Sequence, residues 1–188
     1  MSVWPEINSS IYGAWRLARR DPDGMNYMNL SVDGFWRSFI AIGLSAPAYI
    51  LILLVQRAAT GDETVSGPWG PEVLGYILGW VLWPLAALVL CRFLGLAQNF
   101  IPYIIAYNWA NVVHINLLLP IAVLTHGSIM PDGMAMIISL VATLLVLVYL
   151  WWVTKVALGA STGVAMGFIL LDILVGVLVS HGADRLFV

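Results

Sequence analysis

Five long apolar stretches constrain the fold of this chain more than any other feature of its sequence. A helix needs about 20 mostly apolar residues to cross the hydrocarbon core of a bilayer. Stretches of about that length run over residues 36–55, 73–94, 101–125, 134–154 and 160–180. Short connectors rich in glycine, proline or charged residues separate them, at residues 61–71, 95–99, 126–133 and 155–159. The sequence therefore predicts an all-α integral membrane protein, with five transmembrane helices over residues 36–188.

The composition agrees with this class and excludes several functions. Of the 188 residues, 61% are hydrophobic and 10% are charged, whereas soluble domains carry about 25% charged residues. A net charge of −2 without a basic face argues against binding to nucleic acid. The single cysteine, Cys91, excludes an intrachain disulfide and a cysteine-pair metal or redox motif.

The basic residues predict which way the protein points. Lysine and arginine are enriched in the cytoplasmic loops of membrane proteins. With five crossings, one side holds six basic residues: Arg16, Arg19, Arg20, Arg37, Arg92 and Lys155. The other side holds Arg57 and Arg185, together with five acidic residues: Asp62, Glu63, Glu72, Asp132 and Asp184. This asymmetry predicts a cell inner (plasma) membrane protein with a cytoplasmic N-terminus and a C-terminus outside.

Residues 1–35 form a cytoplasmic segment that includes an amphipathic stretch. On a helix over residues 9–20, Ile11, Trp15 and Ala18 share one face, and three arginines lie on the other: Arg16, Arg19 and Arg20. This pattern is typical of a helix that lies in the headgroup plane, where an aromatic side chain is buried and anionic lipid attracts the arginines. A docking site for a cytoplasmic partner is the alternative.

Asp172 is the acidic residue placed deepest in a span. It lies about twelve residues into the fifth span, which at 1.5 Å per residue is a depth of about 18 Å, close to the bilayer midplane. Insertion of an aspartate there costs roughly 2.5–3.5 kcal/mol. We therefore expect Asp172 to face the helix bundle and to find a partner or a proton.

The third span offers partners at the same depth. Steps of 100° per residue place Tyr107, Asn111 and His114 on one stripe of this helix, with Asn108 at its edge and Asn116 almost opposite. An Asp172–His114 contact, direct or through Asn111, is geometrically permitted. Such a group forms a proton or ion route, an interhelical polar clamp, or a ligand or lipid site.

Glycines at a spacing of four form smooth ridges on two spans. Gly159, Gly163 and Gly167 open the fifth span, and Gly75 and Gly79 lie on the second. Small residues at this spacing let helix backbones approach closely. The facing surface is either a neighbouring helix or another chain, including a second copy of this one.

Prolines interrupt three of the spans. Pro47, Pro84 and Pro120 each remove a backbone donor and are expected to kink their helices. Kinks of this kind occur at binding sites in transporters, but proline is also common in ordinary membrane helices.

Catalytic and metal-binding patterns are missing from the sequence. It contains no His-Glu-x-x-His, no Gly-x-Ser-x-Gly and no phosphate loop, so we expect no enzyme activity and no cofactor. Four residues near the outer side, His126, Asp132, His181 and Asp184, lack the spacing of metal ligands. We therefore expect no metal site.

Five spans, a polar cytoplasmic N-terminal segment, prolines within spans and the run Tyr107-Asn108-Trp109-Ala110-Asn111 resemble bacterial members of the Yip1 family. In its eukaryotic branch this family comprises membrane-trafficking proteins that contact small GTPases. The resemblance implies a five-span membrane domain and carries over no catalytic residue.

Two functions follow as hypotheses. The first is a non-enzymatic scaffold or accessory subunit, which would work in the bilayer through other membrane chains or a homo-oligomer. The alternative is a small proton-coupled transporter or channel that uses Asp172 and His114. A cavity that reaches Asp172 would favour the second, and a dry packed core around it would favour the first.

Overall fold

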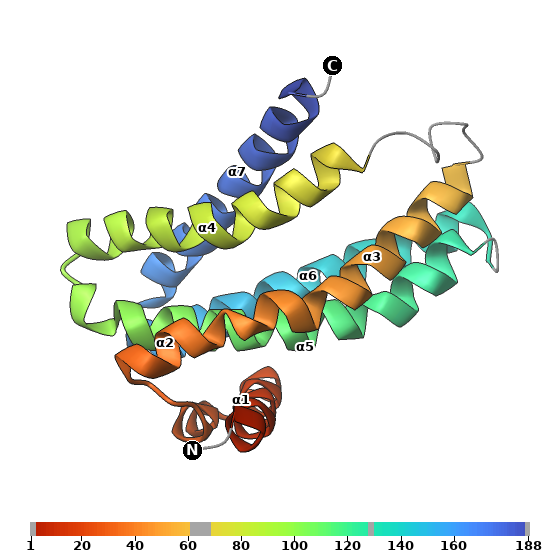
Figure 1. Ribbon diagram of the computed structural model, residues 1–188. Helices are drawn as coiled ribbons and strands as arrows, with labels where there is room; N and C mark the ends of the chain where they lie inside the picture. The colour runs from red at the N-terminus through yellow and green to blue at the C-terminus, as the bar shows by residue number, and fades with distance from the viewer. Residues whose placement is uncertain (1–2, 61–68, 128–129, 187–188) are drawn as a thin grey trace.

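The computed structural model describes residues 3–60, 69–127 and 130–186, and these residues form helices joined by short turns (Figure 1). Five candidate spans are long and apolar enough to cross a membrane. The long helices are α3 (Ile40–Thr60), α4 (Gly70–Phe93), α5 (Phe100–His126), α6 (Asp132–Leu158) and α7 (Thr162–Leu186). Shorter elements are α1 (Val3–Ala18), η1 (Pro22–Tyr27), α2 (Val32–Ser38) and η3 (Ala97–Asn99). The predicted fold class, five transmembrane helices after an N-terminal helix, is confirmed.

The first span is longer than predicted because α2 continues into α3. The two helices form one candidate span, Val32–Ala59, which begins before Trp36. Ser31 starts it, since its hydroxyl accepts a hydrogen bond from the backbone N–H of Gly34 at 3.1 Å. The predicted connector 61–71, with Asp62 and Glu63, lies largely outside the described residues.

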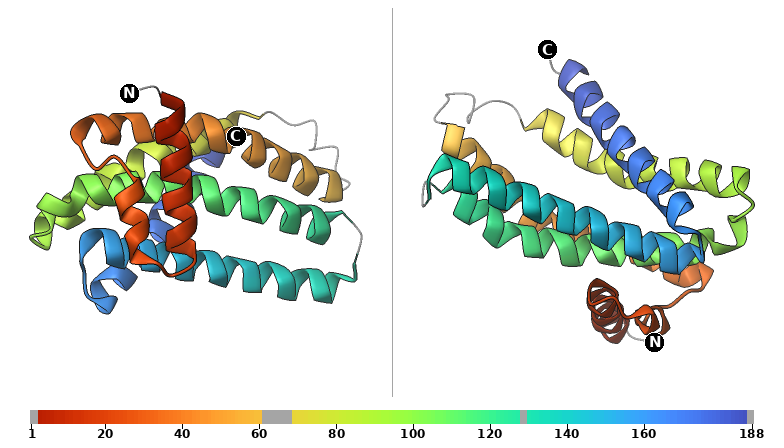
Figure 2. Two further views of the ribbon diagram at one scale, coloured as in Figure 1. Left: turned by 90° about the horizontal axis from the view of Figure 1, so that it is seen from below. Right: turned by 180° about the vertical axis from the view of Figure 1, so that it is seen from behind.

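The long helices form two layers. α3, α5 and α6 pack side by side, whereas α4 packs chiefly on α7. α7 begins beside the end of α6 and diverges from it toward the C-terminus (Figure 2). α5 is the central helix, because an unbroken run of its residues, 103–110, is buried. The predicted proline positions, Pro47, Pro84 and Pro120, lie inside continuous helices.

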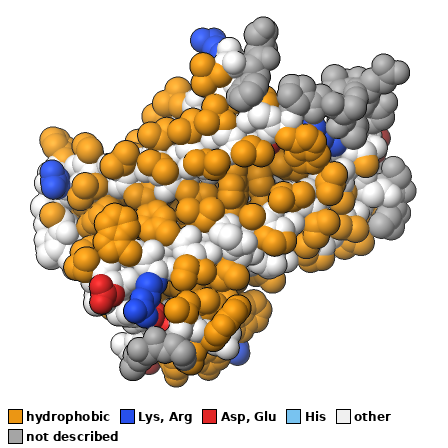
Figure 3. Space-filling model, viewed as in Figure 1, with side chains coloured by type: hydrophobic (Ala, Val, Ile, Leu, Met, Phe, Trp, Pro, Cys, Tyr) orange, Lys and Arg blue, Asp and Glu red, His pale blue; other side chains and the backbone are white. Residues whose placement is uncertain are grey.

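The outer surface of the bundle is apolar. Hydrophobic side chains cover most of the face in Figure 3, and the charged side chains visible there lie toward the ends of the helices and on the N-terminal segment. Soluble monomers rarely expose apolar patches larger than a few hundred Å². This surface fits a multi-pass membrane protein.

The N-terminal helix α1 crosses α5 and α6 and packs against both of them (Figure 2). Ile7, Ala14 and Leu17 are buried, and the Tyr149 hydroxyl on α6 donates to the carbonyl of Ala14 at 2.8 Å. The predicted apolar face is not the one that packs on the bundle, because Trp15 is 44% exposed and Ile11 is only partly buried; its contact with lipid stays a prediction.

The helix also begins at Val3 rather than Ser9 and ends at Ala18 rather than Arg20. Its buried face includes three small residues, Ser10, Gly13 and Ala14. A search for large apolar side chains does not mark such a face.

Two glycines, which lack a side chain, let α1 and η1 approach each other closely. A Cβ added at Gly13 would lie 2.5 Å from the carbonyl oxygen of Gly24, and one added at Gly24 would lie 2.4 Å from that of Gly13. The Glu6 carboxylate accepts from Arg37 at 2.7 Å and from Asn29 at 3.1 Å, which ties α1 to the start of the first span. The N-terminal segment is therefore a packed part of the protein.

Replacement of Gly13 by alanine should loosen the N-terminal segment. The new Cβ has to displace backbone rather than a flexible side chain, and overpacking of this kind typically costs about 1–3 kcal/mol. We expect a lower melting temperature in detergent and faster proteolysis near residue 20. Gly43→Ala is the matched control, because a Cβ there meets nothing within 4 Å. Equal stability of the two variants would contradict the close approach of α1 and η1.

Candidate binding cavity between the two layers

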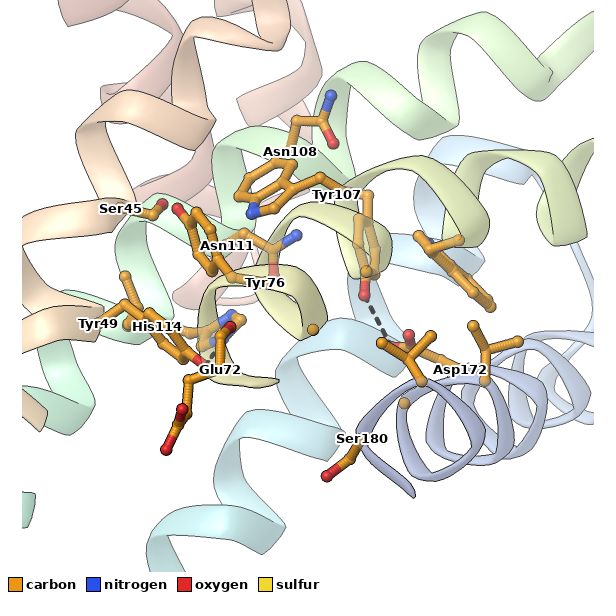
Figure 4. A pocket seen from close by; sticks show the side chains of 18 of the residues that line it. Ser45, Tyr49, Glu72, Tyr76, Tyr107, Asn108, Asn111, His114, Asp172 and Ser180 are labelled. Carbon is orange, nitrogen blue, oxygen red and sulfur yellow. Dashed lines mark hydrogen bonds between the residues drawn. The ribbon is translucent and has the colours of Figure 1, made fainter. Parts of the chain in front are cut away.

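A cavity of about 490 Å³ lies between the two helix layers (Figure 4). Side chains of α3, α4, α5 and α7 line it. Ligand sites in proteins typically have volumes of about 300–1,000 Å³ and mostly apolar walls with a few placed polar groups. By size this is a space that a small molecule can occupy.

The structure brings all four predicted polar residues to this cavity: Asp172, His114, Asn111 and Asn108. Asp172 accepts a hydrogen bond at Oδ2 from the Tyr107 hydroxyl, at 2.8 Å. Within the described residues, Asp172 and His114 form no hydrogen bond with each other. The partner of Asp172 is instead Tyr107, which lies on the same stripe of α5 as His114 and beside Asp172 (Figure 4).

Several polar atoms of the cavity wall have no protein partner. Across the described residues, seven buried side-chain atoms lack a hydrogen-bond partner. Four of the seven belong to residues that line this cavity: Ser45 Oγ, Glu72 Oε2, Trp83 Nε1 and His114 Nδ1. An unsatisfied buried polar atom costs about 1–3 kcal/mol. All four atoms are buried within the wall rather than exposed to the open volume.

Asn108 differs from the other three predicted residues. Its side chain is 1% exposed, and its amide donates to the Ser38 hydroxyl at 2.9 Å. Ser38 in turn donates to the carbonyl of Phe35 at 2.7 Å. Asn108 therefore joins α5 to α2, and its contribution to the cavity wall is secondary to this joint.

Two tyrosines close one edge of the cavity between α3 and α4. The rings of Tyr49 and Tyr76 stack with centroids 4.7 Å apart. The Tyr76 hydroxyl donates to the carbonyl of Ile42 at 2.6 Å, and the Tyr49 hydroxyl donates to the carbonyl of Glu72 at 3.4 Å. Sequence reasoning missed both, because no spacing along the chain links residues on two different helices.

The charge of the cavity wall is acidic. Three acidic residues line it: Glu72, Asp172 and Asp184. No lysine or arginine is among the described lining residues. Glu72 forms an ion pair with Arg57. Asp172 Oδ1 accepts no hydrogen bond within the described part of the chain, and the residue is partly exposed to the cavity.

The two predicted glycine ridges differ in what lies against them. Gly163 and Gly167 have nothing within 4 Å of an added Cβ, so no described part of the chain packs on them. On α4, Gly75 faces the side chain of Ala183 on α7, at 4.0 Å, and Gly79 lines the cavity.

Gly159 is not part of the helix ridge. Its φ of +61° ends α6 in the left-handed conformation that glycine favours. The Asn99 amide completes this helix end by donating to the carbonyl of Leu158 at 2.8 Å. The prediction of Gly159 as a packing residue of the fifth span was therefore wrong, since α7 begins only at Thr162.

The predicted surface anchor lies on the outer side of α1. Trp15, Arg16 and Arg19 line a shallow concavity with Tyr12 and Asp21. The Asp21 carboxylate forms an ion pair with Arg16 and raises the pKa of the Arg16 guanidinium above its ordinary value. The third arginine, Arg20, lies over the rings of Trp151 and Trp152. Contact of this surface with lipid stays a prediction.

Within residues 3–60, 69–127 and 130–186, no group of three or more His, Cys, Asp or Glu side chains could hold a metal ion. Comparison with protein-family models, curated proteins and solved structures found no match for this chain. The resemblance to the Yip1 family therefore stays a prediction.

Two asparagines on α5 allow the α5–α2 hydrogen bond of Asn108 to be tested separately from the cavity wall. Asn108→Ala removes a buried hydrogen bond and leaves a small void, so we expect a loss of about 1–3 kcal/mol in the free energy of unfolding. Asn111→Ala removes a side chain that faces the cavity, and we expect a change within about 0.5 kcal/mol. Chemical unfolding in a mild detergent would measure both, and equal losses would contradict the assignment of Asn108 as the joint.

Proposed function

We propose that this multi-pass membrane protein binds a small solute in the cavity between its layers and passes it across the membrane, with Asp172 as the coupling group. The observation that carries the proposal is the cavity itself, which reaches an aspartate about halfway along a membrane helix. Ionisable groups at this depth typically mark substrate or proton pathways.

A purely structural polar clamp fits the geometry less well. In a clamp the polar groups satisfy one another across helices. Here Asp172 receives one hydrogen bond, from Tyr107, while His114 Nδ1 and Ser45 Oγ stay without partners among the described residues. The open volume beside Asp172, which is partly exposed to it, is the environment of a binding site.

The positions of the basic side chains support a cytoplasmic N-terminus in the inner membrane. Arg16, Arg19 and Arg20 lie in or just after α1, while Arg92 and Lys155 lie near the C-terminal ends of α4 and α6, and α6 packs against α1. In this orientation the start of α4 and the end of α7 lie outside. Glu72 and Asp184, from those two ends, then place one side of the cavity toward the outer face.

Coupling follows from the cost of charge at Asp172. A proton and a bound solute that interacts with the carboxylate compete for the same group, because either one offsets its charge. Tyr107 can donate to either form of the carboxyl group, so the hydrogen bond holds Asp172 in place throughout. We therefore expect solute movement and proton movement to be linked.

A flux assay in liposomes tests this function. The purified protein is reconstituted with an internal pH-sensitive dye, and amines, amino acids, sugars and organic acids are added outside in turn. We expect one class to drive a proton flux, and Asp172→Asn to abolish it, because the amide cannot exchange a proton. Asp132→Asn is the control, since this exposed residue at the start of α6 lies outside the cavity. Absence of flux with every class, or equal flux in Asp172→Asn, would contradict the proposal.

A second candidate, a scaffold or accessory subunit, is favoured by the unoccupied glycine surface of α7. Gly163 and Gly167 are exposed, and no described residue packs against them. Another membrane chain, or a second copy of this one, can approach closely there.

Bulky residues on this surface test the second candidate. Gly163→Ile with Gly167→Ile should shift the protein to a smaller species in detergent, because two branched side chains keep a partner helix away. Gly43→Ile on α3, also at a glycine with nothing within 4 Å, is the control. An unchanged oligomeric profile by light scattering would count against assembly through α7.

A further inference from the structure

The chemistry of the cavity wall narrows the class of molecule that it can bind. Its charged lining residues are all acidic, and Glu72 has its own cation, Arg57. Among the described residues Asp172 has none: its one hydrogen-bond partner there is the neutral hydroxyl of Tyr107. A carboxylate at this depth is stabilised by an opposite charge, and the described lining residues supply no lysine or arginine to provide it.

Aromatic rings form much of the remaining wall. Five aromatic side chains from α3, α4 and α5 line the cavity: Tyr49, Tyr76, Trp80, Trp83 and Tyr107. The face of an aromatic ring attracts a cation, and groups of such rings bind quaternary ammonium ligands. Trp83 and Tyr107 lie next to each other, with ring centroids 5.4 Å apart, so an aromatic pair stands beside the Asp172 carboxylate.

We propose that the cavity is a site for a small organic cation, an ammonium group on a compact body, held between the Asp172 carboxylate and the aromatic wall. This assignment rests on the proposed function and names its substrate class. Ser45 and Glu72 lie away from Asp172 in the cavity (Figure 4). They line the part of the cavity that the body of the ligand would occupy.

An anion is the poorest fit to this wall. It would meet Asp172 and Glu72, with no lysine or arginine among the lining residues that the structure describes, and the like charges would repel it in a medium of low dielectric constant. A neutral solute would fill the volume but would leave the Asp172 carboxylate without a counter-charge. The three charge classes therefore predict an order of affinity that an experiment can measure.

Three probes of nearly the same shape separate charge from size. Choline is a cation, 3,3-dimethyl-1-butanol is its neutral counterpart, and 3,3-dimethylbutyrate is an anion. Titration calorimetry of the purified full chain in detergent should show choline binding about tenfold tighter than the alcohol. The anion should show no measurable heat.

Variants identify the side chains that give the preference for choline over the alcohol. Asp172→Asn keeps an acceptor for Tyr107 and removes the charge, so choline affinity should fall about tenfold while the affinity of the alcohol is unchanged. Asp172→Glu keeps the charge and should retain part of the preference for choline. Trp80→Leu should weaken choline more than the alcohol, and Asp132→Asn should behave as the unmodified protein. A monodisperse gel-filtration profile and a retained melting transition show that each variant is folded.

Equal affinity for choline and the alcohol, tighter binding of the anion, or no binding of choline would overturn the cation assignment. These outcomes are distinct from failure of the transport proposal. Proton flux driven by sugars or acids, with no preference for choline, would leave transport standing and remove only the substrate class. Choline binding that depends on Asp172, without any flux, would keep the cation site and remove transport.

Discussion

The cost of a carboxyl group at mid-depth in a membrane is the constraint on which the rest of this structure depends. Asp172 cannot face lipid without a penalty of roughly 2.5–3.5 kcal/mol, so α7 turns it toward the layer formed by α3, α5 and α6. The carboxylate meets the Tyr107 hydroxyl at 2.8 Å. Because α4 and α7 pack on each other and diverge from the other layer, the carboxylate lies at a cavity rather than in a closed core.

α5 links packing to the candidate site. Its first half is the most deeply buried part of the bundle, and Asn108 fixes it to α2 through Ser38. From this fixed point, one helical stripe presents Tyr107, Asn111 and His114 to the cavity. A site on a deeply buried central helix keeps its polar groups in place.

Much of the fold and part of the site follow from sequence. The number of spans comes from apolar length alone, and helical spacing correctly places Asn111 and His114 on one stripe with Tyr107. The partner of Asp172 did not follow, because a tyrosine among apolar residues is equally common in a packed core. The face of α1 that packs on the bundle was not predicted, since close packing there depends on Gly13 and other small residues rather than on large apolar ones. The divergence of α7, which leaves Gly163 uncovered, is a tertiary property that no local pattern encodes.

Access from water to the α5 face of the cavity tests the central claim most directly. In a Cys91→Ala background, Asn111→Cys places a thiol on the cavity wall, and Leu117→Cys places one on the same helix outside the cavity, where the side chain is 46% exposed. A charged, membrane-impermeant methanethiosulfonate is applied from the side on which α4 begins. The cavity predicts rapid modification of the cysteine at position 111, slowed by choline, and little at position 117, because a thiol in lipid does not ionise. An unreactive cysteine at position 111, or equal rates at both positions, would contradict it.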